Sequence, residues 1–185
     1  MPGSATRRLL VARGRLVGLA RPRASDRVEF IAAVLGSREL HGKWVEPPAT
    51  AREFRAFVRH GAGRDRYALL VRDRSNGRLV GVVNVANVVG GSFANATLGY
   101  YGFTGAAGGG RMTEAVALAV GWSFDRLGLH RLEANIQPAN APSRALVERL
   151  GFRYEGHSPR MLLIAGVWRD HDRYAVTAEE WRPRP

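Results

Sequence analysis

Residues 99–156 read GYYGFTGAAGGGRMTEAVALAVGWSFDRLGLHRLEANIQPANAPSRALVERLGFRYEG, and this stretch contains the strongest structural signals of the chain. A run of glycines at 108–110 stands between a strand-like segment that ends near Phe103 and residues 112–127, whose apolar side chains recur at helical spacing. At such a junction the first amide groups of the helix have no intrahelical partner, and the helix dipole favours negative charge. The stretch therefore predicts either a phosphate-binding turn, where glycine lets a ligand approach the backbone closely, or a simple flexible loop.

Two motifs that the sequence lacks narrow the type of phosphate ligand. There is no GxxxxGK[ST] loop, which excludes nucleoside triphosphate hydrolysis, and GxGxxG in its strand-to-helix context does not match either. A coenzyme diphosphate remains compatible with the turn, and Arg111 can add positive charge beside it.

The patterning outside the glycine turn predicts a mixed sheet with helices. Periodicity, capping residues and turn residues place strands at 14–22, 66–72, 78–89, 93–103, 131–136 and twice within 153–177, and helices at 26–36, 51–60, 112–127 and 141–150. Residues 37–48 are rich in helix breakers and predict a loop. The central antiparallel meander excludes a doubly wound parallel fold, so the expected class is α/β with a mixed, α+β-type sheet.

Composition and charge set the remaining bounds. With 185 residues, of which 45 % are hydrophobic, we expect one domain over 1–185, with residues 1–13 as a candidate flexible N-terminus. The chain has no cysteine, which excludes disulfides, thiolate metal sites and thiolate nucleophiles, and we expect no metal. No apolar run reaches the roughly 20 residues of a membrane-spanning helix, so we expect a cytoplasmic protein without a membrane partner.

The net charge of +12 is almost all arginine, because Lys43 is the only lysine. Arginine suits phosphate and carboxylate partners, but the codon bias of a GC-rich genome also produces such a composition. The charges are dispersed and form no patch interleaved with aromatic residues, so nucleic acid is not expected as a partner.

Taken together, three segments resemble one known family. Residues 99–156, SRELHGKWVEPP at 37–48 and GVWRDHDRYAVTAEEW at 166–181 closely resemble the GNAT superfamily of N-acetyltransferases, in particular its RimJ/RimL branch. The resemblance implies the GNAT acyl-CoA N-acyltransferase fold, a mostly antiparallel central sheet of about seven strands flanked by about four helices. It also implies acetyl-CoA as the cosubstrate.

The resemblance assigns the coenzyme site residue by residue. In the family a Q/R-x-x-G-x-G/A signature binds the pyrophosphate through backbone amides, and the preceding strand pairs with the pantetheine arm. An asparagine at the start of the next helix also contacts the coenzyme. The matching residues are Tyr100, Tyr101, Gly102, Ala107, Gly108, Gly109, Gly110, Arg111, Met112 and Asn140. Two of them depart from the signature, since Ala107 replaces Gln or Arg and Met112 replaces a small residue.

Acetyl transfer to an amine requires a neutral nucleophile, a polarised thioester carbonyl and a proton for the leaving thiolate. Many members of the superfamily supply this proton from a tyrosine, but Val147 stands at the matching position, and the resemblance leaves Ser143 as the candidate acid. An alternative role for Ser143 is to support the first turn of its helix. No general base stands out: Asn84, Glu133, His171 and relayed water are all candidates.

His41, Trp44 and Asn84 are the candidate acceptor-binding residues, with Glu46 as a further group that attracts an ammonium or faces water. The expected reaction is direct transfer of acetyl from acetyl-CoA to a primary amine, with a protein N-terminal α-amine of the ribosomal-protein type as acceptor. A small-molecule amine and a non-catalytic coenzyme A-binding module are the alternatives. We expect a monomer or a homodimer.

Overall fold

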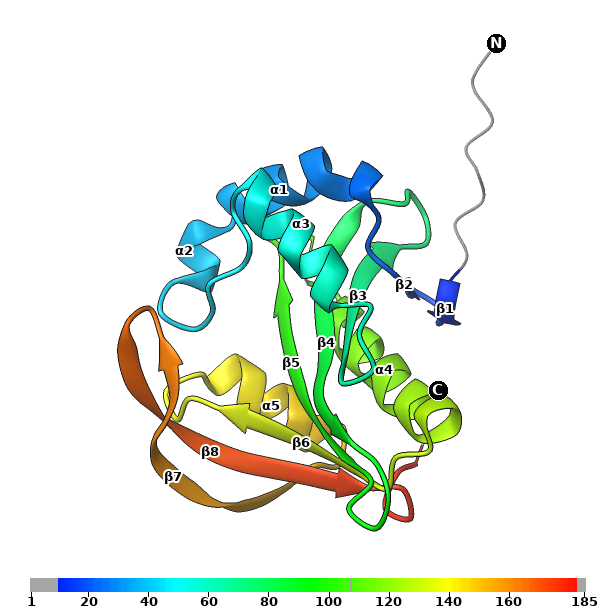
Figure 1. The fold of residues 1–185 in the computed structure, drawn as a ribbon, viewed down its shortest axis with the longest axis vertical. Helices are drawn as coiled ribbons and strands as arrows, with labels where there is room; N and C mark the ends of the chain where they lie inside the picture. Colours follow the sequence, from blue (N-terminus) through cyan, green and yellow to red (C-terminus); the bar gives the residue numbers. More distant parts are fainter. Residues whose placement is uncertain (1–9, 107, 183–185) are drawn as a thin grey trace.

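The computed structural model describes residues 10–106 and 108–182, which form one sheet with helices on both faces (Figure 1). The sheet has eight strands in the order β1-β2-β3-β4-β5-β6-β8-β7, and β5 with β6 is its one parallel pair. The strands are β1 (Leu10–Arg13), β2 (Val17–Ala20), β3 (Arg66–Asp73), β4 (Leu79–Val89), β5 (Asn95–Gly102), β6 (Arg131–Ile136), β7 (Arg153–Ile164) and β8 (Val167–Thr177). The expected mixed, mostly antiparallel sheet is confirmed.

The eighth strand arises at the start of the described chain. The sequence predicted one strand over 14–22 and a flexible segment over 1–13, but residues 10–13 form β1 and pair with β2 as a hairpin. Of the predicted flexible segment, residues 1–9 lie outside the described residues. The turn is closed by a distant residue, because the carboxylate of Glu114 accepts the N–H groups of Arg15, Leu16 and Val17 at 2.7–2.8 Å.

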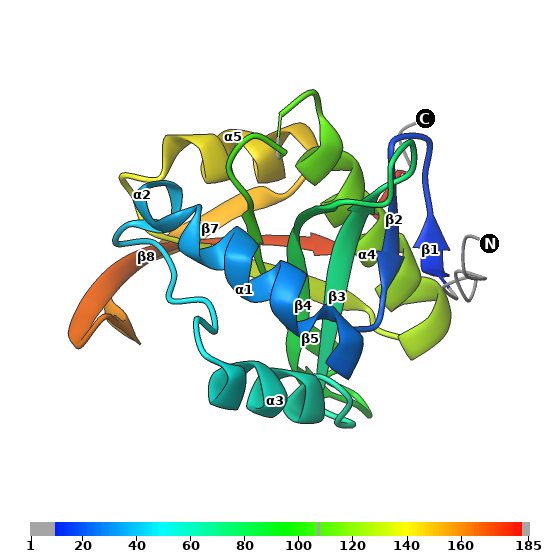
Figure 2. The same ribbon diagram turned by 90° about the horizontal axis from the view of Figure 1, so that it is seen from above.

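The helices lie in two layers. Helices α4 (Arg111–Leu127) and α5 (Ala141–Arg149) pack into one core with the sheet, while α1 (Arg27–Leu35) and α3 (Ala51–His60) pack against the other face (Figure 2). A single 3-10 turn, Ala24–Asp26, precedes α1. Within the described residues no helix is both long and apolar enough to cross a membrane.

One helix falls where a loop was predicted. Residues 37–48 contain α2 (Arg38–His41), one helical turn that ends at Gly42. His41 lies buried in this turn and contacts the rings of Tyr101 and Phe103 edge-on, at 5.3 and 6.0 Å between centroids. Aromatic packing on the sheet therefore stabilises a turn whose own sequence favours a loop.

Helix caps are mostly as the sequence predicts. Thr50 begins α3 with a reciprocal capping box to Glu53, and Asn140 begins α5 by accepting the N–H of Ser143 at 3.3 Å. Asp26 also precedes α1, but its carboxylate makes no cap bond to that helix. It instead accepts the N–H of Arg23 at 2.7 Å and pairs with Arg72 at 3.0 Å.

The sheet splits between its two parallel strands, and this split positions the site. Residues 95–98 of β5 pair with residues 131–134 of β6, and the ladder ends at the Leu98–Ala134 pair. Beyond it β5 stays paired with β4 as far as Gly102, and β6 stays paired with β8 as far as Ile136. The two strands therefore diverge toward their carboxyl ends, as Figure 1 shows.

Candidate active site

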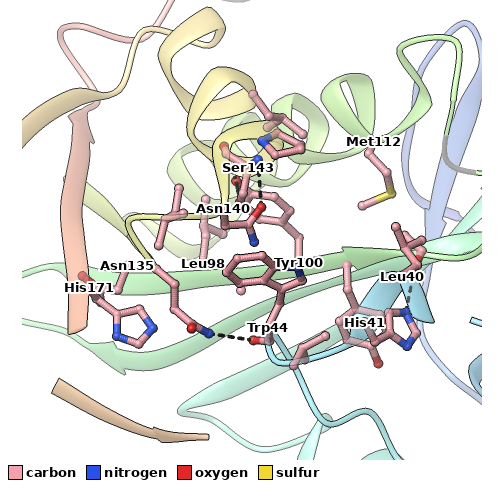
Figure 3. A pocket seen from close by; sticks show the side chains of 18 of the residues that line it. Leu40, His41, Trp44, Leu98, Tyr100, Met112, Asn135, Asn140, Ser143 and His171 are labelled. Carbon is pink, nitrogen blue, oxygen red and sulfur yellow. Dashed lines mark hydrogen bonds between the residues drawn. The ribbon is translucent and has the colours of Figure 1, made fainter. Parts of the chain in front are cut away.

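A cavity of about 710 Å³ lies where β5 and β6 diverge. It is bordered by the start of α4 on one side and the β7–β8 hairpin on the other, with α2 and α5 between them (Figure 3). The residues that line it are Leu40, His41, Trp44, Val45, Leu98, Gly99, Tyr100, Tyr101, Gly102, Gly110, Met112, Thr113, Asn135, Ile136, Gln137, Asn140, Pro142, Ser143, Leu146, Arg149, Leu162, Ile164 and His171. These residues come from segments that lie far apart in the sequence, so the fold creates this site.

The edge of β5 offers main-chain hydrogen bonds to the cavity. The N–H of Phe103 donates to the C=O of Val80 on β4 at 2.8 Å. The main-chain groups of successive residues in an antiparallel strand point alternately to its two sides, so those of Tyr100 and Gly102 point away from β4. His41 Nε2 lies 2.9 Å from the Gly102 oxygen, and because a carbonyl only accepts, this nitrogen donates. The main chain of Tyr100 faces the gap that the β6 ladder leaves. An extended ligand with amide groups can pair there as an added strand.

The glycine turn forms the opposite wall. Gly109 and Gly110 have left-handed φ values of +63° and +77°, and Gly110 is the residue before α4, so a side chain at either position is strained. Gly110, Met112 and Thr113 line the cavity. The amides of the first α4 turn thus lie at its edge, where an anion is favoured. Gly108 is exposed, and Ala107 lies outside the described residues.

Arg111 serves the turn itself. Its Nε donates to Asp73 at 2.8 Å, and its Nη1 donates to the carbonyl of Gly108 at 3.2 Å. Hydrogen bonds from Ser75 and Arg111 hold the pKa of the Asp73 carboxyl well below its usual range. Because it binds both Asp73 and Gly108, the guanidinium of Arg111 fixes the glycine turn to β3. Arg111 borders a neighbouring cavity between α1 and the β5–α4 loop.

Two hydroxyl groups meet at the centre of the cavity. Ser143 Oγ donates to the Tyr100 hydroxyl at 2.7 Å, and that hydroxyl donates to the Ser143 carbonyl at 3.0 Å. Burial raises the pKa of Tyr100 to about 12, so it stays protonated at neutral pH. Val147, at the position of the family tyrosine, is fully buried in the core. Sequence reasoning missed the Tyr100 hydroxyl, because no local pattern joins residues 43 positions apart.

The far end of the cavity carries the acceptor-side candidates. Trp44 lines it and is held by Gln137, whose Nε2 donates to the carbonyl of Lys43 at 3.0 Å. His171 and Asn135 lie on the strands beside it, and Figure 3 shows them at the opposite side of the cavity from Met112. His171 is only 2 % exposed.

The structure does not bring every predicted residue to this cavity. Asn84 lies in the middle of β4, between Ala68 of β3 and Gly99 of β5, and it does not line the cavity. Glu133 accepts from Arg131 at 3.0 Å on β6. Glu46 accepts the N–H of Ala165 at 2.8 Å and ties the loop after α2 to the β7–β8 turn.

The cavity lining carries little charge. Among the described residues that border the cavity, Arg149 is the one side chain with a permanent charge, and no carboxylate is present. Within 10–106 and 108–182, no three His, Asp or Glu side chains are grouped to hold a metal ion.

Known proteins resemble both the sequence and the fold. The family model described as "Acetyltransferase (GNAT) domain" matches residues 17–153. The chain is 40 % identical over 111 residues, 60 % of its length, to the [Ribosomal protein uS5]-alanine N-acetyltransferase of Escherichia coli, and 39 % identical over 102 residues, 55 % of its length, to the Probable N-acetyltransferase YjcK of Bacillus subtilis. These stretches span 57 % and 56 % of the two relatives, so the match covers little more than half of each.

Among solved structures, Mycobacterium smegmatis RimJ in complex with CoA-disulfide superposes with a TM-score of 0.78 at 32 % identity, covering 89 % of this chain and 83 % of that one. The family model covers the β5–α4 turn, the split between β5 and β6 and the hydroxyl pair. The chain therefore belongs to the GNAT acetyltransferase family, in its RimJ/RimL-type branch.

Proposed function

We propose that this protein transfers the acetyl group of acetyl-CoA directly to the N-terminal α-amine of a protein. The observation that carries the proposal is the continuous cavity that runs from the amides at the start of α4, along the open edge of β5, to the acceptor side at His171. Each part matches a part of the reaction.

The cosubstrate fits the first two parts. The amides of the first α4 turn suit a diphosphate, and Tyr100 presents main-chain groups to the two amides of a pantetheine arm. The departures at Ala107 and Met112 do not remove this mode, because backbone groups make the contacts. In this arrangement the main-chain N–H on the β5 edge also polarises the thioester carbonyl.

The hydroxyl pair suits the leaving group. Ser143 Oγ belongs to the first turn of α5 and lies beside the open β5 edge, so it can turn from Tyr100 to donate to the sulfur as the C–S bond breaks. Tyr100 holds Ser143 in place from β5. The chain has no cysteine, which is consistent with direct attack rather than an acyl-enzyme.

The charge of the cavity favours an α-amine acceptor. Polyamines and aminoglycosides carry several positive charges, and the described lining offers them no carboxylate and one arginine. An α-amine with a pKa near 7.7 is neutral in roughly one molecule in six at pH 7, whereas a lysine amine near 10.4 is neutral about once in 2,500. An N-terminal residue with a small, uncharged side chain therefore suits this site. The alanine acceptor in the name of the Escherichia coli relative agrees with this choice.

An acceptor panel tests the proposal. Released coenzyme A is measured with a thiol reagent, which the cysteine-free chain does not consume. The panel holds peptides that begin with Ala or Ser, the same peptides with a blocked N-terminus and one internal lysine, spermidine, and an aminoglycoside. Mass spectrometry of the products locates the acetyl group.

We expect turnover with free N-termini and none with the blocked peptides. Turnover with spermidine or the aminoglycoside alone would replace the protein acceptor with a small amine. Saturable binding of acetyl-CoA by calorimetry, without acetylation of any amine in the panel, would replace the enzyme with a coenzyme-binding module.

A further inference from the structure

The histidine at the acceptor end of the cavity is held in one tautomer. His171 Nδ1 lies 3.0 Å from the carbonyl oxygen of Arg169. A carbonyl oxygen can only accept, so Nδ1 carries the proton, and Nε2 of the neutral ring is left as an acceptor. None of the residues that the structure describes is hydrogen-bonded to Nε2. The ring lines the cavity, and Figure 3 shows it directed inward from β8.

A second acceptor lies nearby. Asn135 lines the same end of the cavity, and its Oδ1 is buried without a hydrogen-bond partner among the described residues. An incoming amine brings N–H donors, so two acceptors at this end match its chemistry. At the other end of the cavity, by contrast, the first α4 turn presents N–H donors.

The charged groups around His171 decide whether its ring stays neutral. Burial lowers its pKa and outweighs the hydrogen bond to the Arg169 carbonyl and the negative charges of Asp170 and Asp172, which raise it. Both carboxylates are engaged on β7: Asp172 pairs with His157 at 3.0 Å, and Asp170 accepts the N–H of Arg160 at 2.7 Å. The remaining charged or titratable groups on the cavity wall are Arg149, His41, Tyr100 and Tyr101. The neutral ring is therefore the form present at pH 7.

From this geometry we infer that His171 is the general base that takes the proton from the acceptor amine. The inference rests on the acetyl transfer proposed above and adds the general base, which that proposal did not assign. The amine lone pair forms the C–N bond at the thioester carbon while the carbonyl π pair moves to oxygen, and the amine proton passes to Nε2. The carbonyl then re-forms, the C–S bond breaks with its electron pair on sulfur, and sulfur takes the Ser143 proton. His171 afterwards returns its proton to solvent, from which Ser143 is reprotonated through Tyr100.

The substitution His171→Gln keeps a polar side chain and removes the titrating group. We expect kcat for an Ala-initiated peptide to fall about 100-fold, which is the lower end of what a positioned base contributes. The dissociation constant of acetyl-CoA should stay within about twofold, since the coenzyme wall lies at the other end of the cavity.

The pH profile separates a base from a merely structural histidine. In the native enzyme, the plot of log kcat/KM against pH should become steeper by one unit of slope below the pKa of His171, because a protonated ring can no longer accept the proton of the amine. This pKa is lowered from the ordinary value of about 6.5, so the extra slope lies on the acid side of that value. It should disappear in His171→Gln. The matched control is His60→Gln at an exposed histidine that ends α3 and does not line the cavity, and this variant should keep both kcat and the slope.

A readout independent of turnover covers the case of a variant that folds poorly. Nitrogen-15 NMR of the native protein should report one buried histidine as the neutral Nδ1–H tautomer, and the assignment follows from its loss in His171→Gln. An Nε2–H tautomer would overturn the inference. So would a native-like rate and pH profile in His171→Gln. A native enzyme that acetylates no amine, while the tautomer is as expected, would instead refute the proposed function.

Discussion

Replacing Ser143 by alanine tests the assignment of the leaving-group acid. The substitution removes the Oγ that donates to Tyr100 at 2.7 Å and leaves the cap bond from the Ser143 N–H to Asn140 in place. If Oγ donates to the developing thiolate, its loss removes one hydrogen bond to a charged group, about 1.5–3 kcal/mol. At 1.36 kcal/mol for each tenfold change, the chemical step should slow about 10- to 150-fold.

Tyr100→Phe completes a double-mutant cycle. The Tyr100 hydroxyl orients Ser143 through a neutral hydrogen bond, about 0.5–1.5 kcal/mol, so the chemical step should slow only about 2- to 10-fold. Because Tyr100 acts through Ser143, the double variant should be no slower than Ser143→Ala alone.

The assay is single turnover with saturating acetyl-CoA and an Ala-initiated peptide, followed by quenching and mass spectrometry. Ser123→Ala is the matched control, since the Ser123 hydroxyl donates to the Ala119 carbonyl at 2.7 Å inside α4, away from the cavity. An unchanged single-turnover rate in Ser143→Ala would refute the reasoning. A slower rate matched by an equal loss of acetyl-CoA affinity would assign Ser143 to binding instead.

Three further changes test the walls of the site. Gly110→Ala places a side chain at φ +77° beside the first α4 amides, a conformation that costs about 1–2 kcal/mol. The variant should therefore bind coenzyme A about 5- to 30-fold more weakly by calorimetry. The control is Gly77→Ala, which has a φ of +74° in the β3–β4 turn and should carry the same strain but bind coenzyme A normally. Glu114→Gln replaces the carboxylate that accepts three main-chain N–H groups and should destabilise the fold by about 2–4 kcal/mol in urea unfolding, and a loss below 0.5 kcal/mol would contradict that role. Asp73→Asn should destabilise the protein more at pH 7 than at pH 2: the folded-state pKa of Asp73 is lowered, so its contribution is complete above the unfolded value of about 3.9 and declines as pH falls from there toward the folded value. A difference between the two proteins that is the same at both pH values would contradict the last prediction.

Local sequence signals predict most of the elements. The alternation over 131–136 and the Thr50 cap give the bounds of β6 and α3 as the structure has them. The hairpin turn at Ala165 and Gly166, with left-handed φ values of +50° and +72°, is likewise encoded by its own residues. These features depend on neighbours within a few positions.

The features that sequence reasoning missed depend on distant partners. The β1–β2 hairpin needs Glu114, about 100 positions away. The guanidinium of Arg111 pairs with Asp73, which lies 38 positions earlier. Asn84 was predicted on the acceptor side, but it lies in the middle of β4 and does not line the cavity. The tautomer of His171 depends on where the Arg169 carbonyl points, which residue types alone do not specify. Asn140 shows the opposite case, since its cap role follows from its position alone.

The short seam between β5 and β6 makes the sheet mechanically unequal along its length. Four residue pairs, Asn95–Arg131 to Leu98–Ala134, join a five-stranded plate to a three-stranded one. A ligand that lies along the open β5 edge and touches α5 contacts both parts of the sheet and bridges the seam between them. Coenzyme binding would then restrict the bending of the β6–β8–β7 plate, which carries His171, against the rest of the sheet. The acceptor side of the cavity would then take a fixed geometry only after the coenzyme has bound. Such an enzyme would bind the coenzyme first and the acceptor second, without any lid.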